Sequence, residues 1–265
     1  MPEPRVYVAG EPGFDNAAMV LAQRLRLPIK KADIAQSGQS AFFLLVAESG
    51  LTLHQAGSPN KGIRVDFAGG GLRHRRLYGG GKNQQIAKAV GIGPKFRPLV
   101  ADLTAGLGRD GFALASLGAE VILCERHPVV FALLEDGVQR AAREAAGDSE
   151  LARIIDRMHL KRIDALGFLE KLHPGEMPDV IYLDPMFPAR DKSAQVKKEM
   201  AIFQHLLDHE TGTGNLLNAA LGKARFRVVV KRPLHAAFLE DIKPGYSIKG
   251  SSTRFDIYPI RKVPR

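Results

Sequence analysis

Apolar residues in the last two thirds of the chain form short continuous runs, and the stretches between these runs have apolar residues three and four positions apart. The runs are typical of buried strands, and the spacing between them is typical of amphipathic helices. The expected strands cover residues 99–103, 120–124, 158–163, 179–183, 226–230 and 254–260, and the expected helices cover 110–117, 128–145 and 164–172. Strands that alternate with helices predict an α/β fold of the Rossmann-like class, in which a mostly parallel sheet carries helices on both faces. Ligands of such folds bind at the carboxyl ends of the strands.

The first part of the chain has a different pattern, with short apolar runs and little helix between them. We expect strands at residues 5–9, 41–46 and 63–67 and one helix at 16–25. These elements predict a small N-terminal α+β subdomain, which we extend over residues 1–83 so that it includes a basic, glycine-rich loop. Residues 84–265 then form the larger α/β domain.

Composition adds the cellular setting. The chain has 265 residues, 45% of them hydrophobic, which is enough to bury a full core. It has no apolar run of about 18 residues, no signal-peptide pattern and a single cysteine, Cys124. We therefore expect a cytoplasmic protein without intrachain disulfides.

The net charge of +10 is unevenly distributed along the chain. It is zero over residues 1–60, +8 over 61–97, −6 over 98–184 and +8 over 185–265. Two basic blocks around an acidic segment are typical of a pocket beside a bound polyanion, although a solvated basic surface is an alternative. The cations that we expect to contact a nucleic acid lie in three clusters, which are Arg73, Arg75, Arg76 and Lys82; Lys192, Lys197 and Lys198; and Lys231 and Arg232.

A glycine-rich turn follows the first strand of the larger domain. Gly106 and Gly108 lie between that strand and a helix, and glycine lets the backbone turn tightly and approach a ligand closely. Glu125 ends the next strand, where a carboxylate can accept hydrogen bonds from both ribose hydroxyls of a nucleoside. Asp110 would repel the pyrophosphate of a nicotinamide dinucleotide but suits the ammonium group of S-adenosylmethionine. The acidic charge of residues 98–184 also favours this cationic sulfonium as the cofactor.

Asp164 follows the third strand and has two interpretations. Its carboxylate can contact the adenine amino group of the cofactor, or it can cap the helix that begins there. The sequence leaves both open.

The fourth strand ends in the segment Asp184-Pro185-Met186-Phe187-Pro188. The exocyclic amine of a base is a poor nucleophile because its lone pair is delocalised into the ring. Asp184 and the carbonyl of Pro185 can accept its two N–H bonds and orient the nitrogen toward the sulfonium methyl, while Phe187 offers a face for stacking. The structural alternative is a strand-end turn with a buried phenylalanine. The segment lies downstream of the glycine turn and Glu125, and this position favours a catalytic role. We expect Asp184, Pro185 and Phe187 to be catalytic.

The sequence lacks other familiar catalytic patterns. His205 and His209 are four residues apart but have no adjacent glutamate and no cysteine partner, so no metal is expected. Neither a Gly-x-Ser-x-Gly elbow nor a phosphate loop occurs.

Several strings of residues resemble the bacterial small-subunit ribosomal RNA guanine-N2 methyltransferases of the RsmJ (YhiQ-like) type. The resemblance covers most of the chain from Val65 onward, and its most specific strings are Asp184-Pro185-Met186-Phe187-Pro188 and Lys197-Lys198-Glu199-Met200. It implies a class I S-adenosylmethionine-dependent methyltransferase fold. It also implies that the cofactor is held by Arg109-Asp110, Glu125-Arg126 and Asp184. The family's dipeptide after the third strand falls on Asp164-Ala165, where we would expect small hydroxyl residues.

The substrate that the resemblance implies is one guanine of 16S ribosomal RNA in the small subunit. The residues themselves predict only that an amino group of a base is methylated. Adenine-N6 or cytosine-N4 methylation is therefore an alternative, and so is a non-catalytic ribosome-assembly factor that keeps the fold.

Overall fold

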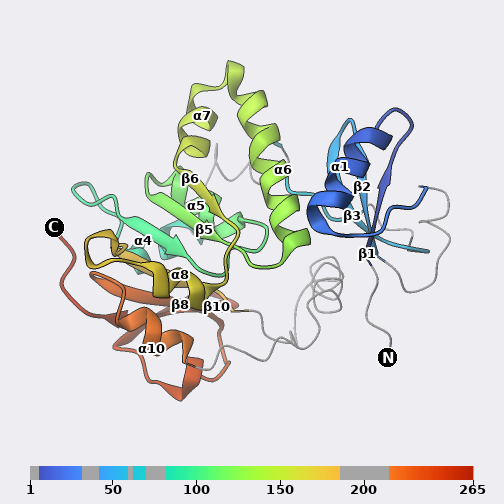
Figure 1. Ribbon diagram of the computed structural model, residues 1–265. Helices are drawn as coiled ribbons and strands as arrows, with labels where there is room; N and C mark the ends of the chain where they lie inside the picture. The colour runs from blue at the N-terminus through green and yellow to red at the C-terminus, as the bar shows by residue number, and fades with distance from the viewer. Residues whose placement is uncertain (1–5, 32–41, 59–61, 70–81, 186–214, 265) are drawn as a thin grey trace. The chain divides into compact units, whose positions relative to one another are not determined.

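The computed structural model describes residues 6–31, 42–58, 62–69, 82–185 and 215–264 (Figure 1). The chain divides into two compact units. One unit includes the chain up to Asp66 together with His127–Arg140, and the other includes Phe67–Arg126, Ala141–Met186 and the chain from Thr211 onward. The expected boundary at residue 83 stays a prediction.

The larger unit contains a seven-stranded sheet in the order β6-β5-β4-β7-β8-β10-β9 (Figure 1). Its strands are β4 (Leu99–Asp102), β5 (Glu120–Cys124), β6 (Met158–Lys161), β7 (Val180–Leu183), β8 (Arg227–Pro233), β9 (Tyr246–Lys249) and β10 (Thr253–Pro259). The strands from β6 to β8 are parallel, whereas β10 is antiparallel to both β8 and β9. The strand order reverses direction between β4 and β7, so the carboxyl ends of these two strands border the place where ligands of such sheets bind.

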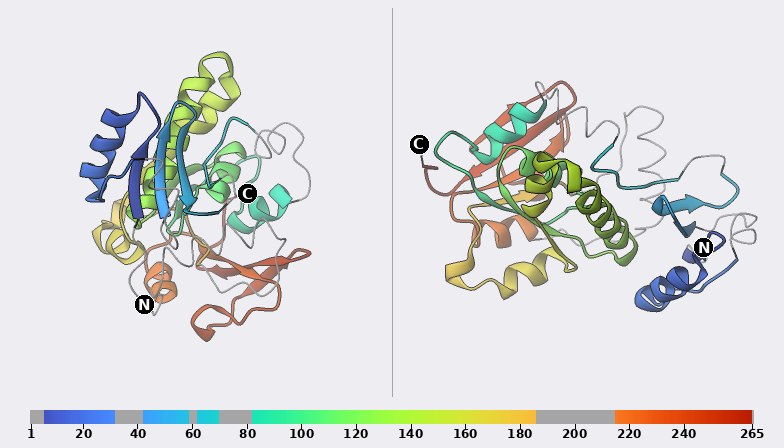
Figure 2. Two further views of the ribbon diagram at one scale, coloured as in Figure 1. Left: turned by 90° about the vertical axis from the view of Figure 1, so that its right-hand side faces the viewer. Right: turned by 90° about the horizontal axis from the view of Figure 1, so that it is seen from above.

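Helices cover both faces of this sheet, as the sequence pattern predicts. The helices of the unit are α4 (Lys82–Val90), α5 (Arg109–Ser116), α7 (Ser149–Asp156), α8 (Ala165–Lys171) and α10 (Leu216–Leu221). Helix α5 contacts α4 and α7, and α8 contacts α10. Figure 2 shows α4 (teal) and the pair α8 and α10 (yellow and orange) on opposite faces of the sheet. Because both faces are covered, every residue of β7 is buried.

The smaller unit contains a three-stranded sheet in the order β1-β2-β3. The strands β1 (Val6–Gly10) and β2 (Phe42–Ala47) are parallel, and β3 (Gly50–Gln55) is antiparallel to β2. Helix α1 (Asp15–Leu25) packs against β1 and β2 through Ala18, Ala22 and Leu25.

Helix α6 (Pro128–Glu144) contributes its residues up to Arg140 to the smaller unit. Asp136 Oδ2 accepts hydrogen bonds from the backbone N of Leu51 at 3.1 Å and from Arg140 Nε at 2.8 Å. Arg140 also donates to the carbonyl of Val65. These bonds tie the sheet and the segment around Val65 to the helix.

The strands expected at the start of the chain and in the larger domain are confirmed, with ends that differ by a few residues, except for the one at 63–67. Within that range only Ile63 forms a bridge, to Leu53 of β3, and the carbonyl of Val65 accepts a hydrogen bond from Arg140. The sequence analysis missed β3 and β9, as well as the helices α4, α7 and α10. β9 is a short strand with partly exposed residues and lacks a continuous apolar run.

Candidate active site

A tight turn connects β4 to α5 at the carboxyl edge of the sheet. Gly106 and Gly108 adopt φ values of 53° and 71°, in the left-handed region that favours glycine. Ala105 N donates to the carbonyl of Cys124 at 3.1 Å, which joins the turn to the end of β5. A Cβ placed on Gly106 would meet nothing closer than the carbonyl oxygen of Thr104, at 3.9 Å. The turn therefore presents open space at Gly106, as a ligand-binding turn requires.

Glu125 lies beside this turn, as the sequence predicts. Its Oε2 accepts a hydrogen bond from Gly106 N at 3.0 Å, and its own backbone N donates to the carbonyl of Lys161. The carboxylate is partly exposed, while the side chains of Arg109 and Arg126 are exposed. The structure thus brings together the two parts of the predicted nucleoside site, the glycine turn and the acid that ends β5.

A hydrogen-bonded path connects the ends of β4 and β7. The backbone N of Asp184 donates to Thr104 Oγ1 at 2.6 Å, and Thr104 N donates to Asp102 Oδ1 at 3.1 Å. The Thr104 hydroxyl lies 3.4 Å from the same Asp102 oxygen. Threonine can accept and donate through one oxygen, so Thr104 holds the Asp184 backbone next to the glycine turn.

Asp102 is a site residue that the sequence analysis did not single out. It ends β4 and is only 2% exposed. Burial raises the pKa of Asp102 to about 8; the hydrogen bond from Thr104 lowers it, the charges of Asp110 and Asp184 raise it, and Lys231 lowers it. An acidic residue immediately before a glycine turn was the signal that could have found it.

Lys231 lies among the acidic residues of the site. Its Nζ is 2.6 Å from Asp110 Oδ2 and 2.9 Å from Asp184 Oδ2, and the buried Tyr182 hydroxyl donates to the same Asp110 oxygen at 2.7 Å. Burial lowers the pKa of Lys231, but the charges of Asp184 and Asp110 outweigh burial, so the pKa is raised. Burial, together with Asp110 and Asp184, raises the pKa of Tyr182. The expected contact of Lys231 with nucleic acid stays a prediction; in the structure its ammonium is bound to two carboxylates.

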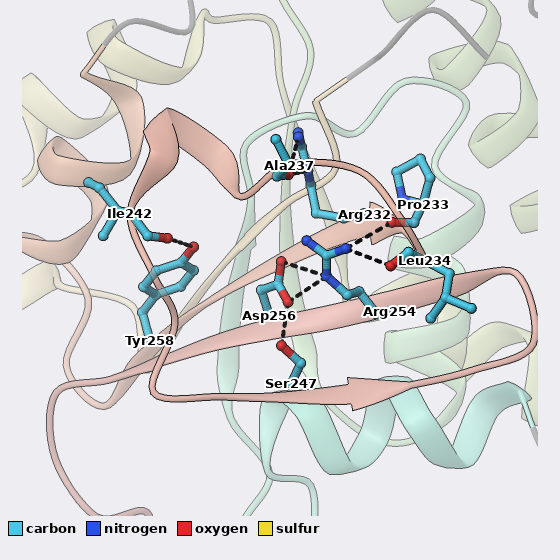
Figure 3. Close-up of polar contacts among 9 residues, drawn as sticks. All are labelled: Arg232, Pro233, Leu234, Ala237, Ile242, Ser247, Arg254, Asp256 and Tyr258. Carbon is cyan, nitrogen blue, oxygen red and sulfur yellow. Dashed lines mark hydrogen bonds and ion pairs between the residues drawn. The ribbon is translucent and has the colours of Figure 1, made fainter. Parts of the chain in front are cut away.

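Arg232 differs from its expected role at a nucleic acid. Successive residues of a strand face opposite sides of the sheet, so Arg232 points away from the Lys231 cluster and is only 4% exposed. Figure 3 shows that it donates to the carbonyl of Ala237 beside the buried pair Arg254–Asp256. Burial, and then the charge of Arg254, lowers the pKa of Arg232. Arg232 stabilises the end of β8 and is not a surface cation.

Asp164 caps helix α8. Its Oδ1 accepts a hydrogen bond from Gly167 N at 2.9 Å, and its backbone is extended, as at other helix N-caps. The capping interpretation is confirmed, and α8 itself begins at Ala165. A contact from Asp164 or Ala165 to the cofactor stays a prediction.

Pro185, the residue after Asp184, is buried. Phe187 lies outside the described residues, as do Met186 and Pro188 of the same segment. The predicted nucleic-acid contacts that also lie outside them are Arg73, Arg75, Arg76, Lys192, Lys197, Lys198 and the side chain of Lys82.

The charges of the site suit S-adenosylmethionine. Asp110, Asp184 and Glu125 are acidic groups at the carboxyl edge, and Lys231 is placed between the first two. An anionic pyrophosphate would meet these carboxylates, whereas a cationic sulfonium with an ammonium group is attracted by them. When bound, this cofactor supplies a methyl group on a positively charged sulfur. The contact of Glu125 with the ribose stays a prediction; in the structure Glu125 accepts from Gly106 N, and Asp102 accepts from Thr104 N.

The described residues were also compared with what membrane spans and metal sites require. None of the helices there is long and apolar enough to cross a membrane. Within the same ranges, no three or more His, Cys, Asp or Glu residues gather as a metal site would require.

Comparisons with known proteins show the family of the chain. Residues 28–260 match a family model described as "Putative SAM-dependent methyltransferase". The ribosomal RNA small subunit methyltransferase J of Cellvibrio japonicus is 49% identical over 95% of this chain and 96% of that protein. The protein of the same name from Pseudomonas aeruginosa (strain LESB58) is 50% identical over 98% and 97%.

A solved structure shows the same fold. The crystal structure of an S-adenosylmethionine-dependent methyltransferase from Neisseria gonorrhoeae has a TM-score of 0.72 and 34% identity, and the match covers 96% of this chain and 95% of that one. The chain belongs to the S-adenosylmethionine-dependent methyltransferase family that includes the ribosomal RNA small subunit methyltransferases J.

Proposed function

We propose that this protein transfers the methyl group of S-adenosylmethionine to the exocyclic N2 amine of one guanine in 16S ribosomal RNA of the small subunit, in the cytoplasm. The observation that carries the proposal is the position of Asp184. Its backbone is bonded to Thr104 in the glycine turn, and its carboxylate is fixed by Lys231. An acceptor for the base amine therefore lies directly beside the turn that would hold the methyl donor.

Some residues of the site bind S-adenosylmethionine, and others bind the base amine. Glu125 accepts hydrogen bonds from the cofactor ribose, and Gly106 lets the backbone come close to the cofactor. The carboxylate of Asp184 and the carbonyl of Pro185 accept the N–H bonds of the base amine, so its nitrogen faces the methyl group. Orientation of this kind supplies much of the rate, because a misplacement of about 1 Å can cost on the order of 100-fold.

The nucleic-acid substrate follows from the relatives and from charge. The relatives with 49–50% identity are named as small-subunit ribosomal RNA methyltransferases. The basic segment 61–97 and the lysines after the Asp-Pro segment supply cations for RNA phosphates, and we assign this contact to Arg73, Arg75, Arg76, Lys82, Lys192, Lys197 and Lys198. The base must leave its stack to reach Asp184, and Phe187 would stack on it there.

The test is methyl transfer from labelled cofactor to small subunits, to free 16S RNA and to DNA, followed by digestion to nucleosides. We expect the label in N2-methylguanosine. Label in N6-methyladenosine or N4-methylcytidine would replace guanine by one of the alternative amines. No transfer to any of these substrates would favour the assembly-factor alternative.

Asp184→Ala provides the matched test of the site. We expect it to fold and to lose transfer by at least about 100-fold, because the amine loses its acceptor. Asp156→Ala, which removes an exposed aspartate at the end of α7, serves as the control and should keep wild-type transfer. Near-normal turnover by Asp184→Ala would contradict the assigned role.

A further inference from the structure

The ammonium group of Lys231 occupies a central position in the site. It contacts Asp184 and Asp110 at 2.9 and 2.6 Å, and its side chain is 24% exposed. It extends from β8, the strand that pairs with the strand ending at Asp184. A partly buried ion pair of this kind is screened less by water and salt than a pair on an open surface.

A cation near the acidic residues around Lys231 reduces the electrostatic repulsion between them. The charges of Asp110 and Asp184 both act on the buried Asp102 and raise its pKa, because like charges at short range favour the protonated form. A base amine offers N–H donors to its partner, and an ionised carboxylate accepts them more strongly than a protonated carboxyl, whose O–H is itself a donor. The positive charge of Lys231 offsets the repulsion at Asp184, which is the acid proposed to contact the base.

The orientation of Asp184 depends on the same lysine. Lys231 is held on its other side by Asp110, and Asp110 is held by the hydroxyl of the fully buried Tyr182. The carboxylate of Asp184 is thereby connected to the core of the sheet, while Thr104 fixes its backbone. A carboxylate fixed at both places presents a defined acceptor position.

We propose that Lys231 is a positioning residue for methyl transfer, which keeps the Asp184 carboxylate ionised and aligned for the base amine. The inference rests on the proposed function, because it assigns Asp184 to the base. The charged and titratable groups around Asp184 are Lys231 from β8, Asp110 from α5, Asp102 from β4 and Tyr182 from β7, while Arg232 of β8 lies on the opposite side of the sheet and acts on Asp184 only through its charge. Arg232 is directed to the Ala237 carbonyl, and Lys231 is in direct contact with Asp184.

The test compares Lys231→Met and Lys231→Arg by the pH dependence of kcat at saturating cofactor and RNA. Lys231→Met should lower kcat by about 100-fold near neutral pH and move the acidic limb of the profile to higher pH, since Asp184 is protonated more readily without the cation. Part of the activity should return at alkaline pH. Lys231→Arg keeps the charge but changes its position, so kcat should fall less and the acidic limb should stay in place.

Lys223→Met is the matched control. Lys223 is also a partly buried lysine of the larger unit, and its Nζ donates to the carbonyl of Leu172 at 3.0 Å. This variant should keep the wild-type profile, and thermal unfolding checks that every variant is folded. An equal loss of kcat at all pH values in Lys231→Met would show a merely structural role and overturn the proposal.

The arginine variant decides the question if Lys231→Met does not fold. An unchanged acidic limb with reduced kcat supports the proposal, and a limb that shifts to higher pH overturns it. Asp184→Ala separates this inference from the proposed function. Near-normal turnover there would overturn the assignment of Asp184, whereas an inactive Asp184→Ala beside a fully active Lys231→Met would remove only the role of Lys231.

Discussion

At the scale of single residues, each carboxylate of the site has a hydrogen-bond or ion-pair partner. Asp184 and Asp110 share the ammonium of Lys231, and Glu125 accepts from Gly106 N. Asp102 is buried, no cation among the described residues forms an ion pair with it, and its carboxyl accepts from Thr104 N. Burial therefore raises its pKa to about 8, so it is mainly protonated at neutral pH.

We expect Asp102→Asn to remove a pH dependence of stability. The ordinary pKa of this side chain is 3.8, and the pKa in the folded protein is about 8. Because the folded state holds the proton more tightly, the stabilisation is fully present below about pH 4 and is lost as the pH rises toward about 8. Urea unfolding of wild type and variant between these limits measures the effect. Wild-type stability should fall relative to Asp102→Asn as the pH rises.

The control for this prediction is Asp156→Asn, which changes an exposed aspartate of α7. Its stability should follow the wild-type curve. Parallel curves for wild type and Asp102→Asn would contradict the prediction.

At the scale of elements, the antiparallel pair β8 and β10 determines where Lys231 lies. Arg254 on β10 donates to the carbonyls of Pro233 and Leu234 at the end of β8, and Asp256 accepts from Arg254 Nε at 2.9 Å and from Ser247 at 2.5 Å (Figure 3). Arg254, Asp256 and Arg232 are all at least nine-tenths buried. One carboxylate therefore balances two buried guanidinium groups beside the strand that carries Lys231.

Asp256→Asn should lower the free energy of unfolding by about 3 kcal/mol or more, because it removes the charge that contacts the buried guanidinium of Arg254 and also acts on Arg232. Thermal and urea unfolding measure the loss. The control is Arg225→Ala, which removes the ion pair of Arg225 with Asp179 at 3.1 Å. Arg225 is 47% exposed, so this change should cost less than about 1 kcal/mol. Equal losses in the two variants would argue against the buried cluster.

At the scale of the whole molecule, the charge pattern separates the two substrates. The acidic segment 98–184 contributes the carboxylates around the cofactor turn, and the net +8 of residues 61–97 lies elsewhere in the sequence. This division suits a cationic cofactor in a pocket and a polyanion on the surface. The contribution of the basic segment is best measured through salt, because each phosphate contact releases counterions.

Replacing Arg75 and Arg76 together with alanine should weaken RNA binding and reduce its salt dependence. If both contact phosphates, the slope of log K against log salt should become shallower by about 1.5 to 2. Filter binding or fluorescence anisotropy over a salt series gives the slope. The control replaces Arg143 and Arg153, two exposed arginines of the acidic segment, and should leave the slope unchanged. An unchanged slope in the Arg75 and Arg76 variant would remove this pair from the RNA contact.

The sequence by itself determined the strands β4 to β8 and β10 of the larger sheet, the glycine turn and the family of the protein. Strand periodicity and glycine spacing are local properties, so they placed Gly106, Glu125 and Asp184 correctly at the carboxyl edge. Only the tertiary structure decided which charges meet. Lys231 and Arg232 are adjacent in the sequence, yet one joins the carboxylates of α5 and β7 and the other is buried beside β10. The sequence does not show whether a charged residue lies in the site or in the core. Its partner depends on which distant strands pair in the folded protein.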